Sequence, residues 1–404
     1  MMMKRGIVII WMIWVAMTLL AQKAVVSGIV VDRSTGEPVA GASVTADGLS
    51  VVTNEDGFFV LKSEQPQKSI VVSHVGYSTR QVAVDSQTQQ LKIQLLPTAI
   101  QLREVLVTAE NAREIVDAAI ARISQNYSRQ PELYRCFYRE TAKKRQHFIC
   151  VAEGVVDMYK TGYHQTANHD RVAISKGRRL LSPKRSDTLS VKVMGGPVAP
   201  IQLDIVKNTD FLLNAKELDN YVLTMETPTT IGDRRQYVVR MVPAVVVPYP
   251  LYFGKLYIDQ ETLAFTRAEL SLDMSDHHKA TAQMLVRKPL GVRFKPKDLS
   301  LTVDYRQGAD GMTRISYIRT TFRFNCDWKR RLLATSFEAC CELVVTSSTD
   351  KDVRPIRGRE SFDQRDAFFD RVDYFRDPAF WQDYNIIEPT ETLDRAINRL
   401  LKKY

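Results

Sequence analysis

The stretch from Gly28 to Pro97 decides the fold of the first part of the chain. It reads GIVVDRSTGEPVAGASVTADG over residues 28–48, VVTNEDGFFVL over 51–61, SIVVSHVGYST over 69–79 and QQLKIQLLP over 89–97. Short runs of alternating apolar residues are separated by Gly, Pro, Asn and Asp. This pattern is typical of a small all-β sandwich with tight turns.

The stretch divides into about seven expected strands. These are Val25–Val31, Gly41–Ala46, Ser50–Thr53, Phe58–Leu61, Ser69–His74, Arg80–Val84 and Leu91–Leu95. The turn Asn54-Glu55-Asp56-Gly57 places a glycine where a positive φ is needed. Because they alternate along their strands, the residues that we expect to point into the sandwich are Phe58, Val60, Ile70 and Val72.

The motif G-x-V-x-D-x-x-T-G-E-P-V-x-G-A-x-V, followed by T-N-x-D-G-x-F and S-x-V-G-Y, resembles the carboxypeptidase-regulatory-like domain of the transthyretin-like superfamily. The residues that carry it are Gly28, Val30, Asp32, Thr35 to Val39, Gly41, Ala42, Val44, Thr53, Asn54, Asp56, Gly57, Phe59, Ser73 and Val75 to Tyr77. The resemblance covers residues 24–107. It implies an accessory β-sandwich of the kind found in exported proteins of Gram-negative bacterial envelopes.

The name of this family does not imply a peptidase here. A zinc carboxypeptidase needs two histidines and a glutamate around its metal. No histidine of the chain starts an H-x-x-E or H-E-x-x-H motif; the candidates are His74, His147, His164, His169, His277 and His278. We therefore expect no metal site, no cofactor and no catalytic residues.

The first 21 residues read as a secretory signal peptide. Lys4 and Arg5 precede the apolar run GIVIIWMIWVAMTLLA, and polar sequence begins at Gln22. The alternative is an uncleaved anchor, although the run is short for a membrane span. We expect an exported protein in the periplasm or at the periplasmic face of the outer membrane.

After the sandwich at 22–107, the sequence predicts a linker helix at 108–128, with Ile115, Val116, Ala119, Ile120 and Ile123 at helical spacing. Residues 129–350 are mostly strand-like and predict an antiparallel sheet. Within them we expect a basic insertion from Lys160 to Arg185, a helix or two between Asp204 and Asp219, and a strand around TAQMLVR (281–287).

Residues 252–269 carry the pattern Y-x-G-x-x-Y-I-D-x-x-T-x-A-x-x-R-x-E. It resembles the strand–turn–strand core of lipoprotein-carrier-like half-barrels, in which a curved antiparallel sheet wraps a hydrophobic cavity. The resemblance implies that inward positions line such a cavity; we name Leu223, Val238, Leu256 and Ile258. Residues that pack an ordinary sheet core would give the same pattern.

The last segment, residues 351–404, is expected to lie across the β domain and to end in a helix. Its expected aromatic anchors are Phe368, Phe369, Tyr374, Phe375, Phe380 and Trp381. The run PTETLDRAINRLLKKY (389–404) predicts a helix that begins near Thr390 or Thr392. The fold class is therefore mainly β: an Ig- or transthyretin-like sandwich, a linker helix, a larger curved sheet and a helical tail.

No catalytic constellation stands out. Asp276, His277 and His278 suggest an exposed polar loop rather than a metal site, and His164, His169 and Asp170 have no standard ligand spacing. Glu140 and Glu153 could face one another across a hairpin, with Lys143, Lys144 or Arg145 as their partners. Of the five cysteines, Cys136 and Cys150 are one conceivable disulfide pair, and buried free thiols are expected for most.

The net charge of +10 is concentrated in basic clusters at 143–145, 176–185 and 329–331. They could attract anionic lipid, but solvated loops are the simpler interpretation, and we expect no nucleic-acid partner. The leading hypothesis is a non-enzymatic envelope protein that binds an apolar or amphipathic ligand, or a protein partner. The alternatives are an envelope hydrolase, acting on peptide or glycan, and a component of a TonB-type outer-membrane uptake assembly.

Overall fold

The computed structural model describes residues 23–85, 90–98, 111–184, 187, 195–284, 291–328, 334–374 and 380–402. The expected signal peptide, the first residues of the linker helix at 108–110, the side chain of Tyr374 and the anchor Phe375 lie outside this description. Among the helices that are described, none combines the length and the apolar character that crossing a bilayer requires.

Two small sheets form the N-terminal sandwich, and all seven expected strands are present. The first sheet has the order β4-β1-β7, with β1 Ala24–Asp32, β4 Phe58–Ser63 and β7 Leu91–Leu95. The second has the order β3-β2-β5-β6, with β2 Ser43–Ala46, β3 Leu49–Val52, β5 Ser69–Ser73 and β6 Arg80–Ala83. Among the described strands of the sandwich, β1 and β7 pair in parallel and the other pairs are antiparallel.

The core of the sandwich corrects one expectation by a single residue. Ile70 and Val72 are fully buried, as expected, but on β4 the buried residues are Phe59 and Leu61, not Phe58 and Val60. All four of these residues, 58–61, are apolar, so alternation alone does not say which pair faces inward. The preceding turn agrees with the sequence: Gly57 has φ 72°, and the side-chain oxygen of Asn54 accepts the N–H of Phe58 at 2.9 Å.

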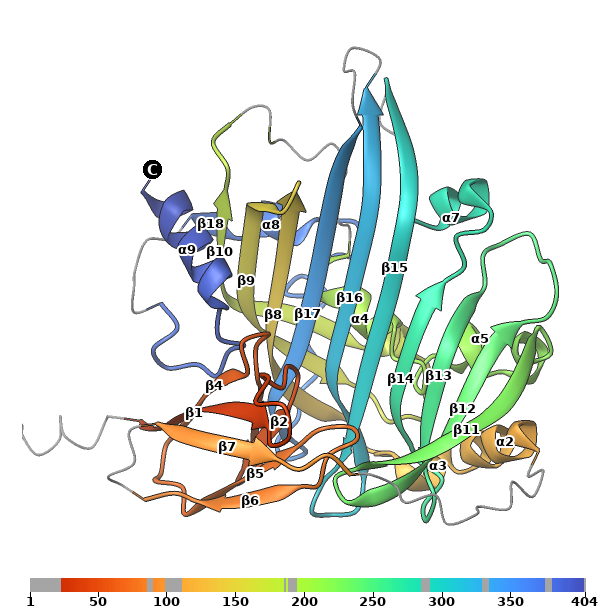
Figure 1. The fold of residues 1–404 in the computed structure, drawn as a ribbon, viewed down its shortest axis with the longest axis horizontal. Coiled ribbons are helices and arrows are strands. Elements are labelled where there is room, and N and C mark those ends of the chain that lie inside the picture. Colours follow the sequence, from red (N-terminus) through yellow and green to blue (C-terminus); the bar gives the residue numbers. More distant parts are fainter. Residues whose placement is uncertain are drawn as a thin grey trace, which may run out of the picture.

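An 11-stranded sheet forms the rest of the molecule (Figure 1). Its order is β11-β12-β13-β14-β15-β16-β17-β8-β9-β10-β18, and only β18 runs parallel to its neighbour β10. The strands are β8 Glu132–Lys144, β9 His147–Lys160, β10 Arg171–Leu181, β11 Tyr221–Ile231, β12 Arg234–Pro243, β13 Tyr252–Asp259, β14 Phe265–Leu272, β15 Val292–Gln307, β16 Thr313–Trp328, β17 Thr335–Thr349 and β18 Asp373–Tyr374. The mainly β architecture expected from the sequence is confirmed.

Two segments differ from the expectation. The basic segment between Lys160 and Arg185 is not an irregular insertion, because β10 lies within it and pairs along β9. The stretch around TAQMLVR was expected as a strand, but its described part belongs to helix α7 (His277–Met284), which begins at the two histidines. Within the stretch, Met284 packs half-buried against the large apolar cluster of the sheet, and Ala280, just before the stretch, is fully buried.

Short helices cover one face of the large sheet, which we call the helix face. They are α2 Ala112–Ala121, α3 Ile123–Asn126, α4 Ala199–Gln202, α5 Thr209–Leu212, α6 Ala215–Leu218 and α8 Phe368–Arg371, with 3₁₀ turns at Ala167–His169 and Gly196–Val198. Val116 and Ala119 of α2 share one apolar cluster with strand residues from β8 to β17. The linker helix and the helices expected between Asp204 and Asp219 are therefore present.

The sandwich and the last part of the chain, residues 380–402, cover the opposite face, which we call the sandwich face (Figure 1). Val52 of the sandwich packs with Trp381, Ile387 and the sheet residue Phe137. The amide of Asn385 donates to the carbonyl of Lys62 at 2.9 Å, and its oxygen accepts the N–H of Lys62 at 2.7 Å. Helix α9 (Glu391–Leu401), capped by the Thr390 hydroxyl as expected, lies on the same face.

A buried carboxylate fastens this C-terminal segment to the sheet. Glu153 on β9 is 1% exposed and pairs with Arg139 and Arg178, each at 2.8 Å. The indole N–H of Trp381 donates to the same carboxylate at 3.1 Å. Burial raises the pKa of Glu153, but the two guanidinium groups outweigh burial, and the net pKa lies below its usual value.

We expect Glu153→Gln to lower the free energy of unfolding by about 3–5 kcal/mol, because it leaves two buried guanidinium groups without a counter-charge. The matched control is Asp157→Asn on the same strand, whose partner Arg135 is 52% exposed. That change should cost no more than about 1 kcal/mol. Urea unfolding followed by tryptophan fluorescence measures both, and equal losses for the two variants would contradict the prediction.

Candidate ligand-binding site

The structure brings together three of the four positions named from the sequence. Leu256 and Ile258 on β13 are fully buried in the cluster of the helix face, and Leu223 on β11 packs against it half-buried. Val238 is different: its neighbour Val239 belongs to that cluster, so Val238 points to the sandwich face. The four positions therefore do not form one lining, and the predicted ligand cavity stays a prediction.

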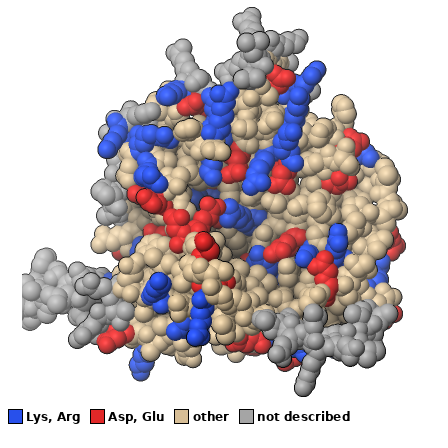
Figure 2. Space-filling view, in the orientation of Figure 1, with Lys and Arg blue, Asp and Glu red and all other residues tan. Residues whose placement is uncertain are grey.

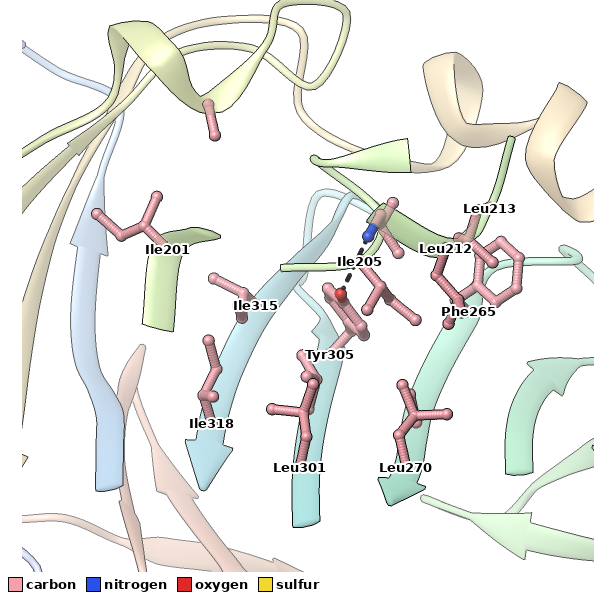
Figure 3. Close-up of a cluster of buried hydrophobic side chains, with 14 of the residues drawn as sticks. Ile201, Ile205, Leu212, Leu213, Phe265, Leu270, Leu301, Tyr305, Ile315 and Ile318 are labelled. Carbon is pink, nitrogen blue, oxygen red and sulfur yellow. Dashed lines mark hydrogen bonds between the residues drawn. The ribbon is translucent and has the colours of Figure 1, made fainter. Parts of the chain in front are cut away.

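Protein side chains fill the helix face beside these positions (Figure 3). Ile205, Leu212 and Leu213 point from the segment of α4 to α6 toward Phe265, Leu270 and Leu301 of the strands. The hydroxyl of Tyr305 accepts the N–H of Val206 at 3.3 Å and donates to Asp204 at 2.8 Å. This part of the face is thus a packed core.

Four buried charges hold this cover on the sheet. The ammonium of Lys160 lies 2.7 Å from Asp204 and 3.5 Å from Asp170, and Lys207 lies 3.5 Å from Asp170. Lys207 also donates to the carbonyl of Gly162 at 2.7 Å. Burial and the nearby Lys160 lower the pKa of Lys207 to about 8. Two cations and two anions cancel, so the set fits a structural role.

The helix face looks different toward the upper ends of β15, β16 and β17 in Figure 1. There a second apolar cluster, which we call the upper wall, consists of Ala142, Ile149, Cys150, Leu181, Val292, Phe294, Phe322, Phe324, Cys326, Trp328 and Phe337. Every member comes from a strand, and no described helix or connecting loop contributes to it. The rings of Phe322 and Trp328 are partly exposed.

Aromatic rings make up the centre of the upper wall. The ring centroid of Phe324 lies 4.7 Å from that of Phe322, 5.0 Å from that of Phe294 and 5.4 Å from that of Phe337. Each distance lies within the range of favourable aromatic contacts. A sheet face of this kind normally packs against a second layer. The partly exposed members of the wall, which a ligand could contact, are Leu181, Phe322 and Trp328.

One carboxyl group borders the upper wall. Glu140 on β8 points to the same face as Ala142, two residues further on, and is 4% exposed. It accepts the hydroxyl of Tyr138 at 2.7 Å, and no cation of the described chain lies within ion-pair distance of it. Burial without a counter-charge raises the pKa of Glu140 to about 7. The group can therefore be a neutral hydrogen-bond donor near neutral pH.

The other residues singled out in the sequence do not meet. Glu140 and Glu153 lie on opposite faces, because Arg139 is the residue paired with Glu153, and the partners of Glu153 are Arg139 and Arg178 rather than residues 143–145. The cross-strand register could not be read from the sequence, since a bulge follows Ala142.

The histidine candidates are scattered. His277 and His278 open α7 and are exposed, whereas His164 and His169 lie in the turns before β10 and Asp170 belongs to the buried charge set. Within the described ranges, no three His, Cys, Asp or Glu side chains are arranged to hold a metal ion.

The five cysteines are free thiols. Cys136 is paired in the ladder with Val156, and Cys150 with Ala142, so the conceivable disulfide between them is not formed. Cys341 packs against the cluster of the helix face, while Cys340 lies on the sandwich face, as adjacent strand residues must.

The geometry defines a class of two-part β protein. A small β-sandwich docks on one face of a large sheet, and other elements of the chain cover much of the rest. Residues 26–107 match the family model of the CarboxypepD_reg-like domain, so the chain carries such a domain in its N-terminal part, as its motifs predicted. No curated protein matched the sequence.

Solved structures show distant likeness over the sheet. A domain described as outer membrane lipoprotein-sorting from Vibrio parahaemolyticus aligns at 10% identity over 60% of this chain and 95% of its own, with a TM-score of 0.25. A LolA superfamily protein from Nitrosomonas europaea aligns at 11% over 62% and 97%, with a TM-score of 0.23. A membrane-associated protein from Bacteroides fragilis aligns at 10% over 81% and 98%, with a TM-score of 0.17. Such TM-scores carry no argument, so the fold rests on its own strand order.

The stability of the chain should depend on the protonation of Glu140. Its pKa rises from 4.5 in the unfolded chain to about 7 in the folded one, so the folded chain holds the proton more tightly between these values. The unfolding free energy should therefore fall as the pH rises through this window and level off above it.

Glu140→Gln should remove this dependence and raise the unfolding free energy at pH 8 by up to about 3 kcal/mol. Near pH 4 the variant and the wild type should differ little. The control is the exposed Glu360→Gln, which should leave the profile of unfolding midpoint against pH unchanged. A wild-type profile identical to that of Glu140→Gln would refute the assignment.

Proposed function

We propose that the chain is a non-enzymatic cell-envelope protein that binds an apolar or amphipathic ligand on the upper wall. The observation that carries this is the aromatic cluster of the wall, to which only strands contribute among the described residues. In this role, the rings of Phe322 and Trp328 contact the apolar part of the ligand. The basic n-region and apolar run at the N-terminus support export to the periplasm.

The carboxyl group of Glu140 could form a hydrogen bond or an ion pair with the polar part of such a ligand. Its carboxyl lies beside the wall with one hydroxyl partner, Tyr138, and no cation of the described residues lies within ion-pair distance. A hydrogen-bonding or cationic head group near it would satisfy a group that the protein leaves incompletely paired. Leu223, Leu256 and Ile258 lie on the same face further along the sheet, in the separate cluster that the helices cover.

A second surface favours a protein partner, in line with a component of an outer-membrane assembly. Six of the eight large apolar side chains that are exposed in the described chain gather at the β11 edge of the sheet, and we call them the edge patch: Val222, Val242, Val245, Val246, Tyr249 and Phe253. Val246 is 92% exposed. An exposed apolar group of this kind is typical of an interaction site. No described strand lies beyond β11, so its backbone edge adjoins the patch.

We expect the wild-type protein to bind the apolar fluorescent probe N-phenyl-1-naphthylamine, and Phe322→Ala to weaken binding by about five- to thirty-fold. This corresponds to about 1–2 kcal/mol of lost apolar contact. The control Phe253→Ala also removes a phenylalanine ring, but from the edge patch. Its affinity should equal that of the wild type. A loss in Phe253→Ala instead would assign the probe to the edge patch, and absence of binding by the wild type would remove the proposal.

For the edge patch, we expect Val246→Asp to abolish recovery of a partner from detergent-solubilised outer-membrane fractions, while the wild type retains it. The substituted side chain is almost fully exposed, so folding stability should change by no more than about 0.5 kcal/mol. The control is Phe322→Ala, which should recover the partner like the wild type, because Phe322 lies on the upper wall and not in the edge patch. Equal recovery with Val246→Asp would exclude the patch as the docking surface.

A further inference from the structure

A cavity of about 310 Å³ lies in the seam between the sandwich and the large sheet. Strands β2, β3 and β5 form its sandwich wall, where Ser43, Ser50 and Ser73 point outward from the sandwich core. Strands β12 to β16 form the opposite wall. A single water needs only ~10–15 Å³ of such space, so the cavity admits a larger group.

Arg306 on β15 lies in this wall with hydroxyl partners only. Its guanidinium donates to the hydroxyl of Ser50 at 2.6 Å and to that of Ser43 at 3.4 Å. No carboxylate of the described residues lies within ion-pair distance of it, although a guanidinium has five N–H donors. Burial lowers the pKa of Arg306 to about 10, and the group is still a cation at neutral pH.

The other two arginines of the cavity are paired with carboxylates. Arg234 lies 2.6 Å from Asp259, and Arg267 lies 2.7 Å from Asp304. Burial lowers the pKa of His74, which lines the same cavity, to about 4, so its ring is neutral at physiological pH. Arg267 also pairs with Glu269 at 2.7 Å and Arg234 with Glu261 at 3.2 Å, so among the described charged residues that line this cavity Arg306 alone has no ion-pair partner.

Arg306 also borders a second cavity in the seam, of about 590 Å³. There too, among the described residues, the neighbouring arginine is paired with carboxylates, whereas Arg306 is not. Arg314, which lines that cavity too, lies 2.6 Å from both Glu132 and Asp310. If Arg306 served only to hydrogen-bond the serine hydroxyls, a neutral side chain would be enough. Burying a charge without a counter-ion is unfavourable. The chain therefore keeps a cation where a neutral side chain would serve the contact with Ser50 equally well.

We propose that this seam cavity binds an oxyanion through the guanidinium of Arg306, with the hydroxyls of Ser50 and Ser73 beside it. The ligand chemistry is a phosphate, sulfate or carboxylate group, either free or carried as the head group of a larger molecule. The planar guanidinium fork suits two oxygen atoms of such a group. Because Arg306 comes from the sheet and the serines from the sandwich, the bound anion would hold the two domains together.

Titration calorimetry on the purified full chain, at constant ionic strength set with sodium chloride, tests this proposal. The probes are inorganic phosphate, sulfate, acetate and a short-chain phosphatidic acid below its micellar concentration. We expect saturable binding at one site by at least one of them. Binding by the inorganic ions identifies a free anion, and binding by the phospholipid alone identifies a head group.

Two variants of Arg306 and one control decide the assignment. Arg306→Gln should abolish binding, and Arg306→Lys, which keeps the charge but loses the fork, should weaken it about tenfold. Arg323→Gln, on the same face but paired with Glu338 and 58% exposed, should bind like the wild type. If the glutamine variant does not fold, the lysine variant decides by itself.

Saturable binding that is unchanged in Arg306→Lys and Arg306→Gln, or no saturable binding by the wild type, would overturn the proposal. The outcome is separate from that of the upper wall, which lies on the other face of the sheet. Arg306→Gln should therefore leave the affinity for N-phenyl-1-naphthylamine unchanged.

Discussion

Both faces of the large sheet carry apolar side chains, and every other feature of the molecule depends on how those faces are kept from water. A sheet that is apolar on two sides needs a layer on each. Helices α2 to α6 and α8 supply one layer, while the sandwich and residues 380–402, which include α9, supply the other. The described covers end before the upper ends of β15 to β17, so the upper wall follows from where the covers end.

Charge pairing separates what holds the fold from what is open to a ligand. Each cover is fastened by buried charges that are paired: Lys160 with Asp204 on one face, and Glu153 with Arg139 on the other. Removing one partner of such a pair is costly, but the intact pair has nothing left to offer a ligand. Glu140 and Arg306 are the contrast, because each is buried or half-buried with hydroxyl partners alone among the described residues. Incomplete pairing thus marks the places where a bound molecule could improve the energy of the protein.

Local patterns in the sequence predicted the elements well and their faces poorly. The turn at Asn54 and the strands of the sandwich follow from residues close together in the chain, as does the cap of α9. The inward face of β4 was wrong by one residue because Phe58 and Phe59 are equally apolar. The partner of Glu153 depends on a cross-strand register with a bulge, and Arg306 meets Ser50 across 256 positions of sequence. Contacts of this kind depend on how whole domains dock, which no local pattern contains.

Strand alternation lets the same strands serve both faces without mixing their chemistry. On β15, Phe294 and Leu301 share the helix face because a bulge between Pro296 and Asp298 shifts the alternation, whereas the exposed Arg293 and Lys295 point the other way. Figure 2 shows Lys and Arg gathered over the upper ends of these strands, above the sandwich. Lower on the same face the sandwich covers the sheet and encloses Arg306. In the proposed site the sandwich supplies hydroxyl groups to a cation of the sheet, and the docked sandwich leaves that cation half-buried.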